Sequence, residues 1–270
     1  MNITRNDKPG RFALITGASK GLGKSFAFDL AKRQINVILV SLPGEGLAQV
    51  AEEVRKTGCE AHFYETDLTD KSNILELTAW INNNFSIDIL INNAGFGGNK
   101  KFLEAGADYL DQMIQLNVKA TSIITHQLLP NLLKCERSYV LNVSSMAAMS
   151  PIAYKTVYPA SKAFVHSFTR SLQNEFCNQG VFFSVLNPGP IKTNGDVSSR
   201  IDKQGIRTKI LVLPSEEIAR LSIDQLFNGT NVIKLNWAHR LGWFLLHVLP
   251  VSVKMSILSN NALKEIENAD

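Results

Sequence analysis

The chain has 270 residues, of which 45% are hydrophobic and 19% are charged, and its formal net charge is +4 at pH 7. These values are ordinary for a globular protein with a sizeable core, and they exclude a disordered or fibrous chain. The positive charge is spread along the chain without a basic block, which argues against nucleic acid as a partner.

The cysteines and the apolar stretches bear on the cellular location of the protein. The three cysteines are far apart and lack metal-ligand spacing, so we expect reduced thiols, a cytoplasmic location and no metal site. Residues 1–12 are polar and charged, without the apolar core of a signal peptide. The most apolar stretch, residues 241–253, is well short of the ~20 apolar residues that a membrane-spanning helix needs.

Short apolar runs alternate with longer helical patterns along the chain. Strands are predicted at residues 11–16, 36–40, 61–67, 87–95, 138–145 and 181–190. Amphipathic helices are predicted at residues 22–33, 46–58, 72–84, 110–134 and 156–178. Nearly continuous apolar strands that alternate with helices indicate a parallel sheet covered on both faces. The prediction is therefore an α/β protein, a single-domain Rossmann fold with a doubly wound parallel β-sheet of about seven strands.

Two regions depart from this alternation. Residues 191–208 are polar and rich in Gly, Ser and Lys, which is typical of a mobile loop. From residue 236 onward the chain is aromatic and apolar, and no linker-like break precedes it. We therefore expect a dinucleotide-binding and catalytic domain at 1–235 and, as part of the same domain, a C-terminal apolar helical extension at 236–270. The extension is interpreted as a substrate lid or a subunit interface, with peripheral membrane contact as the less favoured alternative.

A glycine-rich turn, TGASKGLG at residues 16–23, lies between the first predicted strand and the first predicted helix. Gly17, Gly21 and Gly23 would allow positive φ angles and a close backbone approach to a pyrophosphate, and a helix N-terminus favours anionic oxygens. The spacing differs from G-x-G-x-x-G, so a purely structural strand-to-helix turn is the alternative. The position directly after the first strand favours a dinucleotide site.

Tyr158 and Lys162, in YPASK, are four residues apart on a predicted helix, which places the phenol and the ammonium on one face. The unperturbed pKa of a tyrosine is roughly 10, and a neighbouring cation moves it toward neutral pH. The pair is therefore suited to proton transfer to or from an alcohol oxygen. The alternative is an ordinary solvated helix face.

Together, these motifs resemble those of the short-chain dehydrogenase/reductase family. TGASKGLG at 16–23, NNAG at 92–95 and YPASK at 158–162 occur in the family's order and at its spacings. NVSS at 142–145 and NPGPIKT at 187–193 fit the same pattern. The resemblance covers residues 11–193 closely, and the sequence around YPASK is similar to the branch of 3-oxoacyl and 17β-hydroxysteroid-type reductases.

The resemblance implies a catalytic tetrad. Tyr158 would be the acid/base, and Lys162 would lower the pKa of Tyr158 and hydrogen-bond the nicotinamide ribose. Ser145 would hold the substrate carbonyl oxygen, with Ser144 as its structural neighbour, and Asn117 would support a water-linked proton relay to the lysine. The implied activity is hydride transfer between a nicotinamide and a carbonyl or secondary alcohol.

The resemblance also implies cofactor contacts along the carboxyl edge of the predicted sheet, from the glycine turn to the NPGPIKT segment. The implied set is Gly17, Ser19, Lys20, Gly21, Leu22, Gly23, Ser41, Asp67, Leu68, Asn93, Ala94, Gly95, Tyr158, Lys162, Pro188, Gly189, Ile191 and Thr193. Asp67 would bind the adenine amine, and the alternative for this residue is a helix N-cap, because its segment is rich in capping residues.

The end of the second predicted strand bears on the choice between NAD(H) and NADP(H). NAD-preferring members of the family carry an acidic residue there, whereas this chain has Ser41, whose hydroxyl suits a 2′-phosphate. Lys20, in the glycine turn, occupies a position that is often basic in NADP-preferring members. Leu42 stands where many of those members carry arginine. NADP(H) is the predicted cofactor, and NAD(H) is the alternative.

The predicted function is an NADP(H)-dependent oxidoreductase that acts on a small-molecule carbonyl or alcohol. Apolar segments would cover the substrate, which favours a hydrophobic ketone such as a 3-oxoacyl or steroid-like compound. The alternatives are a non-catalytic dinucleotide-binding protein, such as a redox sensor or scaffold, and a lyase or epimerase on the same fold. Family members commonly assemble through the helices that carry Asn117 and Tyr158, which implies a homodimer or homotetramer.

Overall fold

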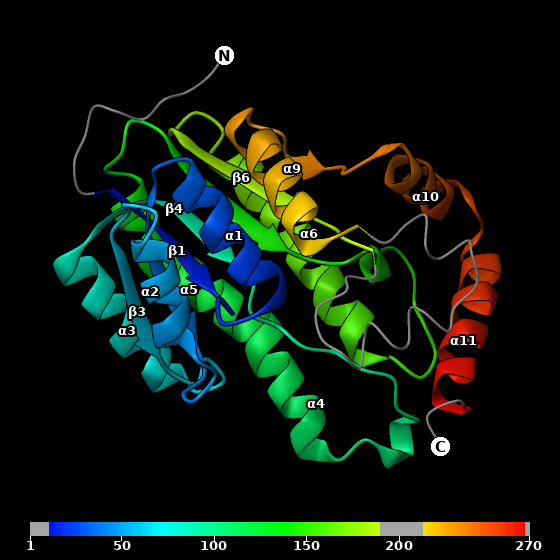
Figure 1. Cartoon of the computed structure of the whole chain (residues 1–270). Coiled ribbons are helices and arrows are strands. Elements are labelled where there is room, and N and C mark those ends of the chain that lie inside the picture. Colours follow the sequence, from blue (N-terminus) through cyan, green and yellow to red (C-terminus); the bar gives the residue numbers. More distant parts are fainter. Residues whose placement is uncertain (1–10, 190–212, 268–270) are drawn as a thin grey trace.

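The computed structural model describes residues 11–189 and 213–267. These residues form an entirely parallel seven-stranded sheet in the order β3-β2-β1-β4-β5-β6-β7 (Figure 1). The strands are β1 Arg11–Thr16, β2 Asn36–Ser41, β3 Ala61–Glu65, β4 Ser86–Asn92, β5 Ser138–Val143, β6 Val181–Leu186 and β7 Val232–Ile233. The predicted doubly wound Rossmann fold is confirmed, and the strand order reverses between β1 and β4, where such folds bind their ligands.

Helices cover both faces of the sheet. One layer contains α1, α2 and α9, and the opposite layer contains α3, α5 and α6. The helices are α1 Gly21–Lys32, α2 Leu47–Arg55, α3 Lys71–Asn84, α4 Ala107–Ile114, α5 Thr121–Leu132, α6 Val157–Glu175, α9 Ser215–Phe227, α10 Trp237–Val248 and α11 Val251–Glu267. Three short helical segments lie at Phe102–Glu104 (η1), Gln115–Ala120 (η2) and Met146–Met149 (η3).

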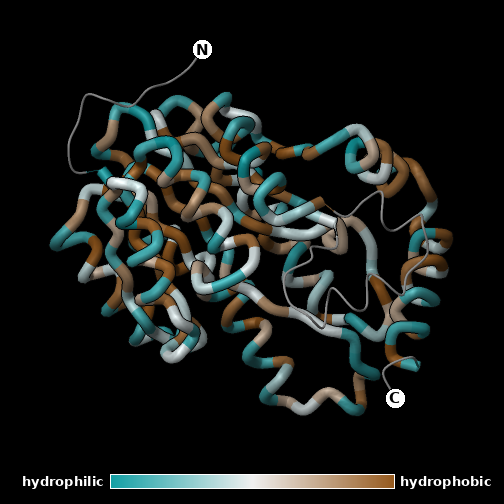
Figure 2. The backbone as a smooth tube through the Cα atoms, viewed as in Figure 1, coloured by the Kyte–Doolittle hydropathy of each residue, from teal (hydrophilic) through white to brown (hydrophobic). Residues whose placement is uncertain are grey.

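The strands are apolar on both sides because a core lies on each face of the sheet. In β1, Ala13 and Ile15 belong to the core under α1, α2 and α9, whereas Phe12 and Leu14 belong to the core under α3 and α5. Hydrophobic positions accordingly follow the strands through the centre of the molecule (Figure 2). With both faces buried, polar side chains gather where the strands end.

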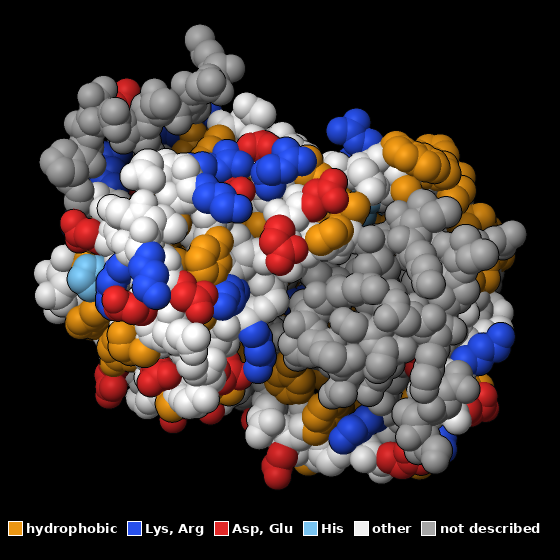
Figure 3. Space-filling model, viewed as in Figure 1, with side chains coloured by type: hydrophobic (Ala, Val, Ile, Leu, Met, Phe, Trp, Pro, Cys, Tyr) orange, Lys and Arg blue, Asp and Glu red, His pale blue; other side chains and the backbone are white. Residues whose placement is uncertain are grey.

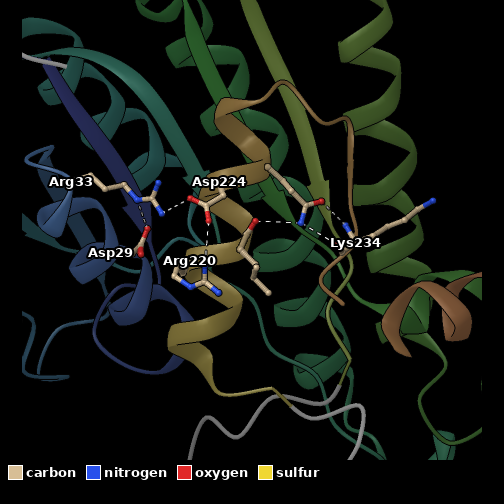
Figure 4. Close-up of polar contacts among 7 residues, drawn as sticks. Asp29, Arg33, Arg220, Asp224 and Lys234 are labelled. Atoms are coloured by element: carbon tan, nitrogen blue, oxygen red, sulfur yellow. Dashed lines mark hydrogen bonds and ion pairs between the residues drawn. The ribbon is translucent and has the colours of Figure 1, made fainter. Parts of the chain in front are cut away.

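A chain of ion pairs joins α1 to α9 across the outside of one layer (Figure 4). Arg33, at the C-cap of α1, contacts Asp29 at 2.8 Å and Asp224 of α9 at 2.8 Å. Gln225 accepts a hydrogen bond from the amide of Lys234 at 3.1 Å and donates one to its carbonyl at 3.0 Å, which fixes the turn around β7. These bonds hold the helix that follows the glycine turn against the C-terminal half of the chain.

The helix predicted at 110–134 is interrupted in the structure. It consists of α4, the π-helical turn η2 and α5, and Asn117 lies within η2. A π turn inserts one residue into the helical spiral and is often found at functional sites. Its hydrophobic periodicity is close to that of the flanking α-helices, so the sequence pattern predicted one continuous helix.

The chain beyond residue 236 forms α10 and α11. On α10, the apolar side chains of Trp237, Leu241, Phe244 and Val248 share one face, and between 50% and 72% of each is exposed. Hydrophobic side chains visibly gather over this helix (Figure 3). Among the helices that the structure describes, none has the length and apolar character needed to cross a lipid bilayer.

A buried polar network ties α5 and α6 to the sheet just below its carboxyl edge. Asn92 of β4 donates to Thr125 of α5 at 3.0 Å and to Asn142 of β5 at 2.8 Å. Asn142 in turn donates to Thr169 of α6 at 2.9 Å. Asn92, Asn142, Thr125 and Thr169 are all buried, so each of these bonds replaces a lost contact with water.

The substitution Asn142→Ala is expected to destabilise the fold. It removes both bonds of the Asn142 side chain and leaves polar groups of Asn92 and Thr169 without those partners, which should lower the free energy of unfolding by about 2–3 kcal/mol. Urea unfolding measures this change. The exposed Asn83 of α3 supplies the control, since Asn83→Ala should stay within about 0.5 kcal/mol of the original. Equal effects of the two substitutions would contradict the assigned role of the network.

Candidate active site

The glycine turn closes over the end of β1 and leads into α1. Gly17 and Gly21 have φ angles of 66° and 55°, which favour glycine. A Cβ on Gly23 would lie 2.0 Å from the Gly17 carbonyl oxygen, so the turn folds this tightly only without a side chain there. Lys20, at the N-cap of α1, gives the helix no side-chain hydrogen bond. The first amides of α1 are therefore available to an anion, and this cradle fits a dinucleotide pyrophosphate.

The segment after β4 is bonded directly to the glycine turn. The side-chain amide of Asn93 donates to the carbonyl oxygens of Thr16 at 3.0 Å and Gly17 at 3.1 Å. The Thr16 hydroxyl accepts from the backbone amides of Asn93 and Ala94, each at 3.0 Å. The two segments that the resemblance places against the cofactor thus form one hydrogen-bonded unit at the switch point of the sheet.

Two serines follow β5 and serve different purposes. Ser144 is buried and donates its hydroxyl hydrogen to the backbone carbonyl of Lys162 at 2.7 Å. Ser145 is partly exposed, accepts from an amide of η3 at 3.1 Å and hydrogen-bonds the side chain of Tyr158. Ser144 therefore joins β5 to α6, while Ser145 faces the phenol.

Tyr158 and Lys162 lie one turn apart at the start of α6, and the Lys162 side chain is buried beneath the tyrosine. The Lys162 Nζ lies 6.0 Å from the centre of the Tyr158 ring and donates to the Val143 carbonyl at 3.0 Å. A Cβ on Gly95 would lie 3.0 Å from this Nζ. The ammonium is thus enclosed between the end of β5, the segment after β4 and the phenol.

Burial shifts the pKa values of both groups. It lowers the pKa of Lys162 from 10.5 to about 8, because removal from water disfavours the cation. Burial also raises the pKa of Tyr158, and the hydrogen bond with Ser145 offsets part of that rise. The resemblance implied that Lys162 lowers the pKa of Tyr158. In this structure Lys162 donates its hydrogen bond to the Val143 carbonyl, and burial keeps the pKa of Tyr158 above its ordinary value, so the phenol is protonated at neutral pH.

Asn117 is buried in η2 and holds the loop after β4 in place. Its Oδ1 accepts from the Phe96 amide at 3.0 Å, and its Nδ2 donates to the Phe96 carbonyl at 2.9 Å. The same Nδ2 donates to Ser161, the neighbour of Lys162, at 3.0 Å. A Cβ on Gly95 would lie 2.8 Å from Oδ1, so Asn117 and Lys162 approach the same glycine. All four residues of the implied tetrad therefore meet in one region.

The NPGPIKT segment continues from β6 at the same edge of the sheet. Pro188 is buried and Gly189 is partly exposed directly after the strand. Ile191 and Thr193 lie outside the described residues, as does the loop predicted at 191–208. The structure therefore places only the first part of the implied nicotinamide segment.

The C-terminal helices are bonded to the loops around the tetrad. His239 of α10 contacts the carbonyl oxygen of Asn187 through Nε2 at 2.6 Å. Lys254 of α11 donates to the Met149 carbonyl of η3 at 3.3 Å, and Ser259 accepts from the backbone amide of residue 153 at 2.9 Å. These contacts place α10 and α11 beside the segments that carry Ser145 and lead into α6.

The implied adenosine contacts lie at the ends of β2 and β3. Ser41 is buried and donates its hydroxyl hydrogen to the Leu42 carbonyl at 3.1 Å. Leu68 is also buried, whereas Asp67 is exposed and accepts from the amide and the hydroxyl of Thr69 at 2.8 Å. The N-cap of α3 is Asp70, so the alternative that made Asp67 the helix cap is wrong.

One acidic residue near the glycine turn was not predicted from the sequence. Glu45, in the loop after β2, accepts from the Ser19 hydroxyl at 2.6 Å and contacts the Lys20 ammonium at 2.6 Å. Its flanks, Gly44 and Gly46, both have positive φ angles. An acid between two glycines in a cofactor-side loop was the available signal.

Gly97 was also not predicted from the sequence. A Cβ on Gly97 would lie 2.1 Å from Cδ2 of Tyr158, so the loop after β4 passes directly against the phenol ring. The signal was the glycine-rich run GFGG that follows NNA. Any side chain at this position would displace Tyr158 or the loop.

Comparison with known proteins identifies relatives of this chain. The sequence pattern of the short chain dehydrogenase family matches residues 11–204. An uncharacterized oxidoreductase of Staphylococcus epidermidis is 31% identical over 184 residues, which cover 68% of this chain and 79% of that protein. The very-long-chain 3-oxoacyl-CoA reductase of Anas platyrhynchos is 30% identical over 256 residues, covering 92% of this chain and 79% of the reductase.

Two further comparisons concern steroid enzymes. Human 17-beta-hydroxysteroid dehydrogenase type 3 is 36% identical over 188 residues, which cover 68% of this chain and 60% of the human protein. Among solved structures, a 7beta-hydroxysteroid dehydrogenase superposes with a TM-score of 0.83 over 92% of this chain and 96% of that chain. That structure is 22% identical in sequence, so it supports the fold alone.

The buried ammonium predicts a pH dependence of stability that Lys162→Met should remove. Below pH 8, Lys162 is protonated in both the folded and the unfolded chain. Between pH 8 and 10.5, the unfolded chain still binds a proton that the folded chain has released, so stability rises with pH. The free energy of unfolding of wild type minus that of Lys162→Met should therefore increase by up to about 3 kcal/mol between pH 7 and 10.5.

Denaturant unfolding at a series of pH values measures this difference. The substitution Lys71→Met, at an exposed lysine, is the control and should show no such growth. A difference for Lys162→Met that stays constant with pH would contradict the lowered pKa of the buried lysine.

Proposed function

This chain belongs to the short-chain dehydrogenase/reductase family of NAD(P)-dependent oxidoreductases that act on CH–OH groups, and from that premise we propose that it reduces hydrophobic ketones with NADPH. The observation that carries the proposal is the meeting of Ser145, Tyr158 and Lys162 beside the glycine cradle. Proton donor, oxygen-binding hydroxyl and cation lie together where a dinucleotide would end.

The residues of the tetrad can then be given roles. A bound nicotinamide supplies the hydride in the reducing direction. Tyr158, protonated at neutral pH, gives its phenolic proton to the substrate carbonyl oxygen, and the Ser145 hydroxyl donates a hydrogen bond to the same oxygen. The Lys162 ammonium stabilises the phenolate that remains. Asn117 holds the loop after β4 at the distance that leaves room for this ammonium.

The preference for NADP(H) rests on charge around the adenosine end. β2 ends at Ser41 and is followed by the exposed Leu42, so the strand end itself offers no carboxylate to repel a 2′-phosphate. Lys20 lies at the N-cap of α1 and 60% of its side chain is exposed, so it supplies a positive charge for the phosphate once the phosphate displaces Glu45, which Lys20 contacts at 2.6 Å. NAD(H) is the alternative cofactor.

The proposed substrate is a ketone on an apolar framework. The human and duck relatives are named for 17-beta-hydroxysteroid and very-long-chain 3-oxoacyl-CoA, respectively. In this chain the bonds of His239, Lys254 and Ser259 support a role for residues 236–270 as an apolar cover beside the tetrad. The exposed face of α10 would remain for a second subunit or a membrane surface.

A homo-oligomer is part of the proposal. An apolar groove follows α5 and α6 on the outside of the molecule, and its lining includes Leu129, Phe168, Leu172 and Phe176. A smaller concave surface, lined by Ile114, Val118 and Val157 among others, lies where η2 meets α6. These helices are the ones through which family members commonly assemble.

Two rival functions are compatible with a dinucleotide-binding fold. A non-catalytic dinucleotide-binding protein has no need of a complete tetrad, and here the four side chains are both present and close together. A lyase or epimerase would use a similar site, so a direct assay must separate it from a reductase. The discriminating reading is a change of absorbance at the NADPH band with a ketone substrate.

Tyr158→Phe tests the proposed chemistry. A screen of NADPH oxidation against steroid ketones, 3-oxoacyl thioesters and small ketones first identifies a substrate. The variant lacks the acidic proton and should lose about 10²–10⁴-fold in kcat, while NADPH binding measured by fluorescence stays near the wild-type value. Retained turnover would reject the assigned acid. A wild-type enzyme that binds NADPH but oxidises it with no ketone would reject the reductase itself.

Lys20→Ala tests the cofactor preference. Wild type should show a higher kcat/KM with NADPH than with NADH, and the variant should lose about tenfold with NADPH only, because the 2′-phosphate loses its cation. Lys24→Ala is the control, since Lys24 lies one turn farther along α1 and pairs with Glu53 at 3.0 Å. A wild-type advantage for NADH, or equal losses with both cofactors in Lys20→Ala, would contradict the preference.

A further inference from the structure

The glycine turn and the loop after β2 meet at the adenosine end of the site. β1 and β2 are adjacent parallel strands, and the amide of Ala18, two residues after the end of β1, donates to the carbonyl of Val40 in β2 at 3.0 Å. This contact brings Ser19 and Lys20 alongside residues 42–46. The turn that would bind a cofactor is therefore within side-chain reach of an element that the tetrad does not use.

Glu45 spans the gap between these two elements. Its Oε2 accepts from the Ser19 hydroxyl at 2.6 Å, and its Oε1 contacts the Lys20 ammonium at 2.6 Å. Each carboxylate oxygen thus has its own donor, so Ser19 and Lys20 together bind the carboxylate as a bidentate anion. A quarter of the Glu45 side chain is exposed, compared with 60% of the Lys20 side chain, so the carboxylate lies on the inner side of the pair.

The loop sequence explains why the carboxylate reaches this place. Gly44 and Gly46 have φ angles of 77° and 75°, in the region that favours glycine, and Pro43 precedes them. Burial raises the pKa of the Glu45 carboxyl, but the hydrogen bonds from Lys20 and Ser19 outweigh it and hold the pKa below its ordinary value. Glu45 is therefore an anion at neutral pH.

We propose that Glu45 is a cofactor-discriminating residue, which occupies Ser19 and Lys20 in place of a 2′-phosphate and so restrains the preference for NADP(H). The inference rests on the proposed function, in which Lys20 faces the 2′ position of the adenosine ribose. A 2′-phosphate must displace the carboxylate to reach the two donors, and the two anions repel each other. A 2′-hydroxyl carries no charge and can donate to the carboxylate where it stands.

The other donor at this end of the site is already engaged. The Ser41 hydroxyl donates to the Leu42 carbonyl at 3.1 Å and is buried. Leu42 carries no charge. Lys20 and Glu45 carry opposite charges, and as a pair they have no net charge. Discrimination between the two cofactors then depends on which anion holds Lys20.

Glu45→Gln tests this role, because it removes the charge and keeps the size of the side chain. The ratio of kcat/KM with NADPH to kcat/KM with NADH should rise about tenfold, through tighter binding of the phosphorylated cofactor. Titration with 2′,5′-ADP and with 5′-ADP should show the same shift in the ratio of dissociation constants, without dependence on any ketone substrate. Glu45→Ala is the second variant and should shift both ratios in the same direction.

Glu53→Gln is the matched control. Glu53 of α2 pairs with Lys24 of α1 at 3.0 Å, one helical turn along the chain from Lys20, so this variant removes an equal charge and should leave both ratios unchanged. Adding Lys20→Ala to Glu45→Gln should abolish the gain, since the released cation is then absent. Unchanged ratios in both Glu45 variants, or equal shifts in Glu53→Gln, would overturn the inference.

The test separates this inference from the proposed cofactor preference. If wild type favours NADH, the proposed preference is wrong, and a rise of the ratios in Glu45→Gln still supports the role of Glu45. If wild type favours NADPH and the ratios do not move, the preference stands and the role of Glu45 is overturned.

Discussion

The site depends on keeping one ammonium group out of water. A buried lysine is costly unless hydrogen bonds and nearby dipoles replace its hydration, and burial has lowered the pKa of Lys162 to about 8. The Val143 carbonyl at the end of β5 accepts from the ammonium, and Ser144 fixes the backbone of Lys162 itself. These partners lie within reach of Lys162 only because α6 is held in a fixed position against β5. The parallel sheet is therefore the scaffold for a charge that no single element could hold.

The same constraint explains where glycine is needed around the site. Gly95 leaves the space that the Lys162 ammonium and the Asn117 amide oxygen approach, and Gly97 leaves the space for the Tyr158 ring. On the cofactor side, Gly23 lets α1 begin against the carbonyl of Gly17. In each case the missing Cβ allows a backbone to approach a functional group closely. The glycines of these motifs are thus required by tertiary contacts as well as by local turns.

Sequence reasoning reached the elements and the tetrad for different physical reasons. Strands and helices followed from periodicity, which depends on the neighbours along the chain. Tyr158 and Lys162 were found because helical spacing places them together without reference to the rest of the fold. The π turn around Asn117, the inward bond of the Ser41 hydroxyl and the bonds of Glu45 depend on which side chains meet across elements. No local pattern encodes those directions, so the charge balance at the adenosine end became visible only in the structure.

The C-terminal helices are bonded to the loops around the tetrad at a few points. His239 of α10 contacts the Asn187 carbonyl, and Lys254 of α11 contacts the Met149 carbonyl. Glu265 of α11 also pairs with Lys155 at 3.8 Å and accepts from the Asn99 side chain. The bonds to the Asn187 and Met149 carbonyls leave those two side chains free to vary. They equally leave the apolar residues of the helices free to vary, because those residues do not hold the tetrad. In the proposed enzyme the reaction is therefore assigned to residues at the strand ends, and the apolar cover for the substrate to the helices beside them.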